Sequence, residues 1–129
     1  MKLLNDFFTI IQNSDKESQV PPLLSDDFTT QVKLNSDHFI YKAHFPNNPI
    51  TPGVCLLQMA QEILEQRIGR QLRLKTAGNI KFRKPVEPTA CPTFFFRKLS
   101  VQDNTVSVSI SVECDDVQLV RMSLMYDIV

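Results

Sequence analysis

HFPNNPITPGVCLLQMAQEILEQRIG, residues 44–69, joins a proline-rich loop to the one long apolar helix that the sequence predicts. Each of the three prolines in the loop fixes φ and disfavours helix in the residue before it, so the loop that carries His44 should be stiff and extended. Thr51 is a candidate N-cap and Pro52 a candidate first helical residue. The sequence therefore predicts a helix over about 53–68, and the rest of the chain is predicted to wrap around it.

The first two turns of this helix lack a polar stripe, which predicts burial on nearly all sides. Their apolar residues are Val54, Cys55, Leu56, Leu57, Met59 and Ala60. Cys55 is expected to behave as a small hydrophobe. From 61 to 67 the helix becomes amphipathic, and Gly69 can cap its end.

Two features of the helix point to chemistry. Gly53 has no side chain at a helix N-terminus, where free N–H groups and the positive end of the dipole can polarise a carbonyl. Gln58 interrupts the apolar run, so we expect a buried amide that must find partners, and Glu62 lies one turn on along the same face. The alternative interpretation is a packed helix whose Gln58 bonds to the backbone.

Alternating and β-branched segments elsewhere predict strands. The predicted strands cover residues 6–13, 28–34, 72–83, 93–99, 106–114 and 117–129. The strand at 93–99 is apolar on both faces through its three phenylalanines, and the pairs Asp103-Asn104 and Asp115-Asp116 predict turns. His38 follows a polar cluster and is predicted to be an exposed turn residue. One buried helix with an antiparallel meander indicates an α+β fold whose sheet curls round the helix.

Length and composition indicate a compact globular protein. The 129 residues, 43% hydrophobic and 22% charged, predict a single domain over residues 1–129. The apolar run at the start is too short for a signal peptide, and no stretch approaches the roughly 18 apolar residues of a membrane span, so a cytoplasmic location without membrane contact is expected. Three widely spaced cysteines outside any CxxC pattern indicate neither a disulfide framework nor a metal site, and no cofactor is expected.

A basic strip follows the helix on a chain of zero net charge. Residues 67–84 hold seven of the fourteen basic residues and no acid. Within it Leu72, Leu74, Ile80 and Phe82 share one parity while Arg73, Lys75, Lys81 and Arg83 share the other, which predicts a half-buried strand with its basic side chains outward. The strip, with Lys84, is a candidate landing site for an acidic or phosphorylated partner, the alternative being a solvated strand face. It is too short, on a neutral chain, to indicate nucleic-acid binding.

The segment HFPNNPITPGVCLLQMAQ resembles the active-site segment of the hot-dog-fold 3-hydroxyacyl-acyl-carrier-protein dehydratases, which read H-F-P-x-x-P-x-x-P-G-V before a helix with a catalytic acid. IKFRKPVEP, residues 80–88, is similar to a second segment of that family, and the likeness runs from about residue 25 to the C-terminus. The resemblance implies a hot-dog fold, a homodimer or higher assembly, and an acyl tunnel built between protomers. Its partner would be acyl carrier protein with a phosphopantetheine-linked chain, docked on Arg73, Lys75, Lys81, Arg83 and Lys84.

The resemblance also implies roles for individual residues. His44 would remove the proton α to the thioester carbonyl, and the N–H of Gly53 would polarise that carbonyl. Phe45, Pro52, Val54 and Leu57 would contact the substrate. The family's acid stands fourteen residues after the histidine, where this chain has Gln58, and one turn later the family's usual glutamine is replaced by Glu62. The two residue types are exchanged, and an amide cannot donate a proton as an acid does.

Three functions remain open at this point. The first is a dehydratase-like lyase that eliminates water to a trans-2-enoyl thioester in fatty-acid or related acyl-chain synthesis, with Glu62 or a water held by Gln58 replacing the acid. The second is a catalytically weakened acyl-thioester-binding subunit that pairs with an active hot-dog relative. The third is a hot-dog acyl thioesterase. The intact combination of His44 and Gly53 favours the first over the third, and Gln58 favours the second.

Overall fold

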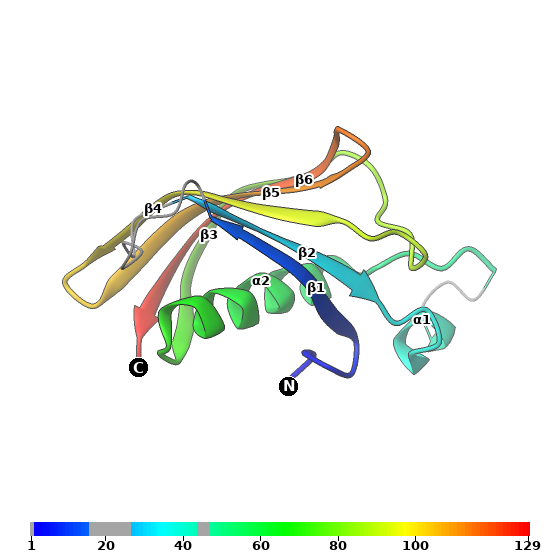
Figure 1. The fold of residues 1–129 in the computed structure, drawn as a ribbon, viewed down its shortest axis with the longest axis horizontal. Coiled ribbons are helices and arrows are strands. Elements are labelled where there is room, and N and C mark those ends of the chain that lie inside the picture. Colours follow the sequence, from blue (N-terminus) through cyan, green and yellow to red (C-terminus); the bar gives the residue numbers. More distant parts are fainter. Residues whose placement is uncertain (1, 16–26, 44–46) are drawn as a thin grey trace.

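A computed structural model describes residues 2–15, 27–43 and 47–129, in which a six-stranded antiparallel sheet curls around one long helix (Figure 1). The strands are β1 (Phe8–Asp15), β2 (Phe28–Leu34), β3 (Leu72–Phe82), β4 (Thr93–Gln102), β5 (Thr105–Cys114) and β6 (Val117–Ile128). The helices are the short α1 (Phe39–Ala43) and the central α2 (Gly53–Ile68). The spatial order β1-β2-β4-β5-β6-β3 places β1 and β3 at the two edges. The predicted α+β hot-dog architecture is confirmed.

Two tight hairpins form the meander β4-β5-β6. Asp103 and Asn104 have φ of 52° and 60°, and Asp115 and Asp116 have φ of 53° and 64°. Two consecutive residues with positive φ give the turn whose twist matches that of antiparallel strands, and Asn and Asp tolerate this conformation better than most residues. Both predicted turns are confirmed, and they fix the register of the three central strands.

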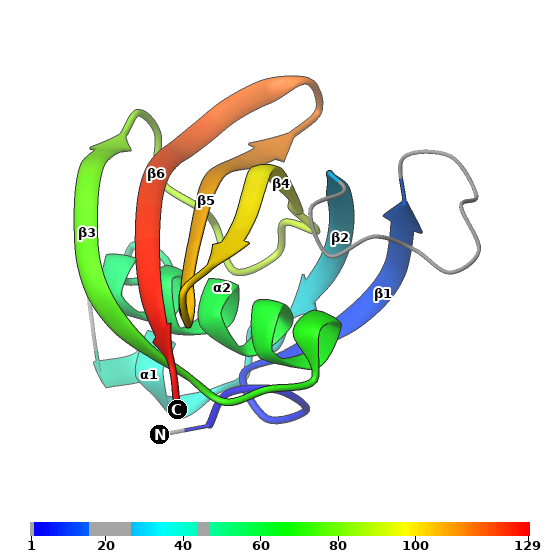
Figure 2. The same cartoon turned by 90° about the vertical axis from the view of Figure 1, so that its left-hand side faces the viewer.

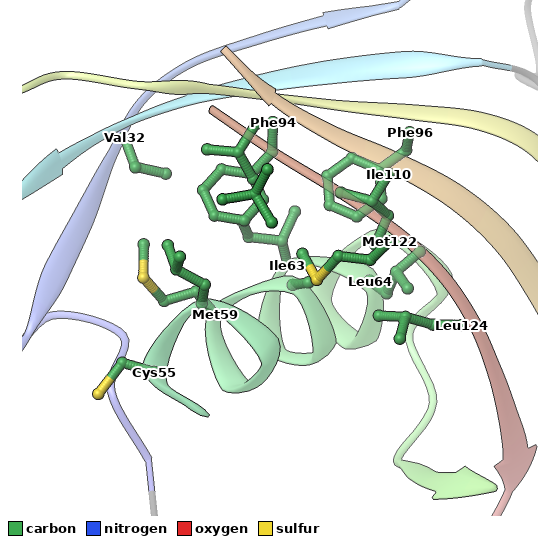
Figure 3. Close-up of a cluster of buried hydrophobic side chains, with 14 of the residues drawn as sticks. Val32, Cys55, Met59, Ile63, Leu64, Phe94, Phe96, Ile110, Met122 and Leu124 are labelled. Carbon is green, nitrogen blue, oxygen red and sulfur yellow. The ribbon is translucent and has the colours of Figure 1, made fainter. Parts of the chain in front are cut away.

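The core lies between α2 and the concave face of the sheet, as Figure 2 shows from the side. Met59, Ile63 and Leu64 of α2 point toward the strands, and side chains of the strands point back at them (Figure 3). The strand contribution includes Val32, Phe94, Phe96, Ile110, Met122 and Leu124. The alternation predicted for the last two strands is confirmed for residues 106, 108, 110, 112, 120, 122, 124 and 126, which are all buried. It breaks down near the end of β5, where Cys114 is only partly buried and Ser111 is buried. Each such large apolar side chain contributes about 1.5–3 kcal/mol relative to exposure.

The predicted boundaries of α2 and its predicted C-terminal glycine are confirmed, but the predicted N-cap, Thr51, is wrong. Gly69 ends the helix with φ 76°, and its N–H donates to the carbonyl of Glu65. At the other end Pro52 occupies the N-cap position and no side chain caps the helix. The Thr51 hydroxyl instead lies 2.9 Å from the Tyr41 hydroxyl, because the last residues of the loop pack against α1.

The first two turns of α2 are not buried on all sides in this chain alone. Val54 is 66% exposed and Leu57 is half-buried, whereas Cys55 is buried as expected. Gln58 is partly buried rather than enclosed. The prediction failed because one curled sheet covers only one side of a helix, so the opposite side stays open however apolar its residues are.

Strand β3 is less covered than its alternation predicts. Leu74 is 40% exposed and Phe82 is 55% exposed, because β3 lies at the sheet edge, where fewer neighbours cover a side chain. Two irregularities in its pairing with β6, between Leu74 and Thr76 and between Gly78 and Lys81, also interrupt the strict alternation. The outward direction predicted for the basic side chains of β3 is confirmed for Arg73, Lys75 and Lys81, which are all exposed.

Two further expectations are corrected near the start of the chain. The first strand begins at Phe8 rather than at residue 6, because residues 3–8 form a turn in which the N–H of Phe7 donates to the carbonyl of Leu3 (2.7 Å). His38 is 7% exposed rather than an open turn residue, and its Nε2 lies 3.1 Å from Asp6 Oδ2. The sequence around His38 could not show this burial, since the covering turn comes from some thirty residues earlier.

The three phenylalanines of β4 divide between the two faces. Phe94 and Phe96 are fully buried, whereas Phe95 lies on the outer face and is half-buried under the Arg97 guanidinium, 4.8 Å from its ring centroid. A strand buried on both faces was expected here. A cation stacked on the aromatic ring takes the place of a second packed layer.

The buried hydroxyl groups of the two tyrosines differ in their hydrogen bonding. Burial raises the pKa of both phenols, that of Tyr41 to about 12, so both stay protonated at neutral pH. The Tyr126 hydroxyl is buried with no hydrogen-bond partner among the described residues, and an unsatisfied buried group costs about 1–3 kcal/mol.

Tyr126→Phe should therefore leave the free energy of unfolding unchanged or raise it. Tyr41→Phe, which breaks the bond to Thr51, should lower it by about 1 kcal/mol. Urea unfolding measures both, and equal losses in the two variants would contradict the assignment.

Candidate functional site

A pocket of ≈ 390 Å³ opens at the N-terminus of α2. It is lined by Ile50, Thr51, Pro52, Gly53, Leu56, Phe82, Arg83, Lys84, Pro85, Val86 and Val120. Most of these residues are apolar, and the two cationic side chains, Arg83 and Lys84, are exposed. The structure thus brings the predicted carbonyl-polarising residue Gly53 together with Pro52 and with two residues of the predicted docking strip.

The helix start that borders this pocket carries backbone N–H groups. The N–H groups of Cys55 and Leu56 donate to the Pro52 carbonyl at 3.0 and 3.3 Å. Those of Gly53 and Val54 have no backbone acceptor within the described ranges. Free N–H groups at the positive end of a helix dipole stabilise negative charge on a ligand oxygen. A mostly apolar pocket beside such a helix start suits an apolar group that carries an electron-rich oxygen.

Phe82 belongs to this site, although it was not among the site residues predicted from the sequence. A Cβ atom built on Gly53 would lie 2.6 Å from Phe82 Cζ, so the aromatic ring occupies the space that any other residue at position 53 would need. A residue other than glycine would have to push this half-exposed ring aside, so the close approach favours glycine at position 53. The alternation of β3 placed Phe82 on the inward parity, but nothing in the sequence linked that position to Gly53.

Gln58 and Glu62 lie in a different depression. This polar groove of ≈ 680 Å³ is lined by Lys2, Leu4, Gln58, Gln61, Glu62, Glu65, Gln66, Gly69, Arg70 and Gln71. None of these residues lines the pocket at the helix start. Within one chain the structure therefore does not bring Gln58 and Glu62 together with Gly53. The other predicted substrate contacts on α2, Val54 and Leu57, line neither cavity.

Glu62 is a buried carboxylate, 5% exposed, surrounded by N–H donors. The backbone N–H of Leu3 donates to both carboxylate oxygens (3.0 and 2.8 Å), and that of Leu4 donates to Oε1 (2.7 Å). The amide Nε2 of Gln58 donates to Oε2 (2.8 Å). A carboxylate survives burial only when it is well hydrogen-bonded, and here every one of these partners is a donor. In this arrangement both oxygens of the Glu62 carboxylate accept hydrogen bonds.

The predicted base lies outside the described residues. His44 and Phe45 fall within residues 44–46, so their places in the site remain predictions. The hydrogen bond between Tyr41 and Thr51 joins the chain before this segment to the chain after it, next to the pocket at the helix start.

Some side chains of the basic strip are exposed to solvent, and others contact neighbouring side chains. Arg73 and Lys81 are exposed on β3, and Lys75 Nζ lies 3.9 Å from Asp127 Oδ1 on the neighbouring β6. The guanidinium of Arg67 lies 4.7 Å from the ring centroid of Phe28. Arg83 and Lys84 are the members of the strip that reach the pocket.

The structure also bears on other classes of site. Among the described residues no group of three or more His, Cys, Asp or Glu side chains could hold a metal ion. Within the same ranges, no helix has the length and apolar character needed to cross a bilayer.

Comparisons with known proteins identify the class. A sequence model of the ApeI-like family, described as ApeI dehydratase, matches residues 22–120. The chain is 33% identical over 96 residues to the 3-hydroxyacyl-[acyl-carrier-protein] dehydratase FabZ of Brucella abortus, a match that covers 68% of this chain and 60% of that relative. This chain thus covers less than two thirds of the relative's length.

Solved structures show the same fold at low sequence identity. The dehydratase heterocomplex ApeI:P from Xenorhabdus doucetiae has a TM-score of 0.64 at 15% identity, covering 92% of this chain and 96% of that one. A hypothetical thioesterase protein with coenzyme A from Streptococcus pneumoniae has a TM-score of 0.57 at 10% identity, covering 97% and 90%. Fold and sequence together define a hot-dog-fold protein of the dehydratase type. The chain belongs to the ApeI-like dehydratase family.

The contact between Gly53 and Phe82 can be tested by a double-mutant cycle. Gly53→Ala should push the Phe82 ring aside and lower the free energy of unfolding, whereas in a Phe82→Ala background it should be neutral or stabilising. Because the ring is half-exposed and can move, we expect a coupling on the order of 0.5–1 kcal/mol. Gly78→Ala, with nothing closer than 4.0 Å to the new Cβ, is the matched control and should cost the same in both backgrounds. Additive effects of Gly53→Ala and Phe82→Ala in urea unfolding would contradict the contact.

Proposed function

We propose that this chain acts on 3-hydroxyacyl thioesters of acyl carrier protein as a dehydratase-like lyase, eliminating water to form a trans-2-enoyl thioester. The observation that carries the proposal is the pocket that joins free N–H groups at the helix start to an apolar lining and to the exposed Arg83 and Lys84. An apolar lining suits an acyl chain, the N–H of Gly53 suits the thioester oxygen, and the cations suit the phosphate of a phosphopantetheine arm. The similarity to the 3-hydroxyacyl-[acyl-carrier-protein] dehydratase of Brucella abortus supports the same substrate class.

In the proposed reaction His44 takes the proton from C2, next to the thioester carbonyl. The electron pair left on C2 is delocalised onto the carbonyl oxygen, where the N–H of Gly53 and the positive end of α2 stabilise the charge. The pair then forms the C2=C3 double bond while the C3–O bond breaks. The leaving hydroxyl needs a proton to depart as water, and this is the step for which the chain lacks a carboxylic acid at position 58.

Glu62 is poorly arranged to supply that proton. Its carboxylate accepts hydrogen bonds from the backbone of residues 3 and 4 and from Gln58, and a proton on either oxygen would displace one of them. Its role as the acid therefore stays a prediction that the observed contacts argue against. Water is the donor that we propose in its place, recharged by the proton that His44 has taken from C2, so we expect slow elimination from this chain alone.

A second copy of the chain is part of the proposal. The pocket beside Gly53 and the groove beside Gln58 share no residue within one chain, so a site that uses both needs two chains. The exposed edge of β3 and the uncovered Val54 leave surface for such an assembly. We propose a homodimer, or a larger assembly, in which one chain supplies Gly53 and the other supplies Gln58.

The second candidate function is a binding subunit that pairs with an active hot-dog relative. The observation in its favour is the pair of Gln58 and Glu62, which contains an amide and a carboxylate occupied by N–H donors in place of an acid. The ApeI:P structure from Xenorhabdus doucetiae, which has the same fold, is a dehydratase heterocomplex. In this case the acid would come from the partner, and this chain would contribute the pocket and the docking surface.

Activity should increase when an acid is restored at position 58. With 3-hydroxyacyl carrier proteins of graded chain length, we expect weak formation of enoyl product by the unmodified protein. Gln58→Glu should raise the rate and His44→Ala should abolish it, since general acid–base groups contribute about 10²–10⁴-fold. Mass spectrometry separates enoyl product from free acid.

Each other outcome of this assay rules against the proposal in a specific way. Rapid turnover by the unmodified protein with no gain in Gln58→Glu would show that the glutamine belongs to a working site. Inert proteins that still bind carrier protein would indicate the binding subunit. Release of free acid would indicate a thioesterase.

Docking of the carrier protein should depend on the basic strip. Reversing the charge at Lys81 and Arg83 should weaken the association, and so should added salt, because exposed charges are screened within about 10 Å at 0.1 M. Lys33→Glu/Lys98→Glu makes the same change in net charge at exposed positions outside the strip and is the matched control. Fluorescence anisotropy of labelled acyl carrier protein measures the Kd. Equal weakening by both double variants would show that net charge, and not the position of the basic strip, determines the affinity.

A further inference from the structure

The pocket at the N-terminus of α2 has an open end and a closed end. At the open end the Phe82 ring is half-exposed, and Arg83 and Lys84 are exposed beside it. At the other end Leu56 and Val120 are fully buried, and both belong to the hydrophobic core. The pocket therefore has its cationic side chains at the mouth and apolar side chains at its inner end.

The register of the sheet locates the closed end. One row of paired residues crosses four strands, because Phe82 pairs with Val120, Val120 with Val112, and Val112 with Phe94. Paired residues of neighbouring strands point to the same face of a sheet. Phe82 and Val120 line the pocket, whereas Val112 and Phe94 do not. The pocket thus extends inward from the edge strand β3 by one strand and ends at β6.

On the helix side the pocket ends after the first turn of α2. Pro52 and Gly53 line it at the helix start, and Leu56 lines it three residues further on. Met59 and Ala60, which follow Leu56 on the same side of the helix, are fully buried and do not line the pocket. At a rise of 1.5 Å per residue, the pocket follows the helix for about 6 Å.

The closed end limits the size of the group that the pocket can hold. A dry cavity of about 150 Å³ holds one benzene molecule, so a pocket of ≈ 390 Å³ has room for on the order of fifteen carbon-sized atoms. A thioester and a 3-hydroxyl group would take several of these places, which leaves room for roughly ten carbons of an acyl chain. Leu56 and Val120 are buried by residues of their own chain, so assembly with a second copy would not open this end.

We infer that Leu56 and Val120 set the length of acyl chain that this site accepts: the pocket takes the thioesters of short- and medium-chain acids, up to about ten carbons. The inference names the substrate class of the proposed function and rests on that function. In the bound substrate the thioester lies at the helix start, the charged arm lies at Arg83 and Lys84, and the end of the chain meets Val120. A longer chain would have to displace buried core side chains or leave part of itself in water, so its extra methylenes add no affinity.

The experiment is a binding series that needs no turnover. Saturated acyl groups of graded length are presented as pantetheine amides, which keep the carbonyl and resist hydrolysis, and calorimetry measures the Kd. Below the limit each added methylene should tighten binding about fourfold, the equivalent of about 0.8 kcal/mol. The gain should stop at about ten carbons. A gain that continues to long chains, or no binding at any length, would overturn the inference.

Substitutions at Val120 should move this limit. Val120→Ala removes two methyl groups at the closed end, so the limit should move to chains that are longer by about one or two carbons. Val120→Ile adds a methyl group there and should move the limit to shorter chains. Val112→Ala is the matched control, because Val112 is equally buried and pairs with Val120 but does not line the pocket. Its binding profile should equal that of the unmodified protein. The same displacement in Val112→Ala and Val120→Ala would indicate a general loosening of the core and reject the assignment.

Dehydration of 3-hydroxyacyl carrier proteins separates failure of this inference from failure of the proposed function. Dehydration without any limit in chain length would retain the lyase and reject the role of Leu56 and Val120. A limit in binding that moves with Val120, without dehydration at any length, would retain that role and reject the dehydratase.

Discussion

The packing of α2 into the concave face of the sheet is the constraint on which the rest of the structure depends. Met59, Ala60 and Leu64 are fully buried against strands whose inward side chains come from both halves of the chain. Fixing this face of the helix fixes the opposite face as well, since side chains three and four positions apart share a side. Gln58 and Glu62 are thereby placed together in the outer groove. The helix start is carried to the pocket formed with the end of β3.

The candidate site forms where strand β3 ends, not in the densely packed centre of the sheet. Phe82 is the last residue of β3, and Arg83 and Lys84 follow it out of the strand, so the aromatic ring and the two cations reach the helix start together. The N–H groups of Arg83 and Lys84 donate to the Leu119 carbonyl on β6, which holds this chain exit in place. Two exposed cationic side chains and a mostly apolar pocket are consequently neighbours in the fold.

Local patterns predicted those parts of the structure whose causes are local. The paired residues with positive φ at 103–104 and 115–116, the αL glycine at 69 and the alternation over most of β5 depend on neighbouring residues, and all were predicted correctly. The burial of His38 depends on a turn some thirty residues away, and the exposure of Val54 depends on what lies opposite an uncovered helix face. The backbone partners of Glu62 were not predictable either, because every residue except proline carries a backbone N–H group.

The exchange of carboxylate and amide along α2 shows why a residue count alone does not settle the chemistry. Moving the charge from position 58, where the resemblance implies it, to position 62 conserves net charge, and in this chain the two side chains are hydrogen-bonded to each other. It changes which of them meets the N-terminal turn, and so where a proton can reside. At position 62 the charge is stabilised by backbone donors and is fully engaged. At position 58 a carboxyl group would lack those donors and would face the groove, where it could keep and release a proton. The difference between a structural anchor and a catalytic acid is thus one helical turn, decided by which position the backbone donors reach.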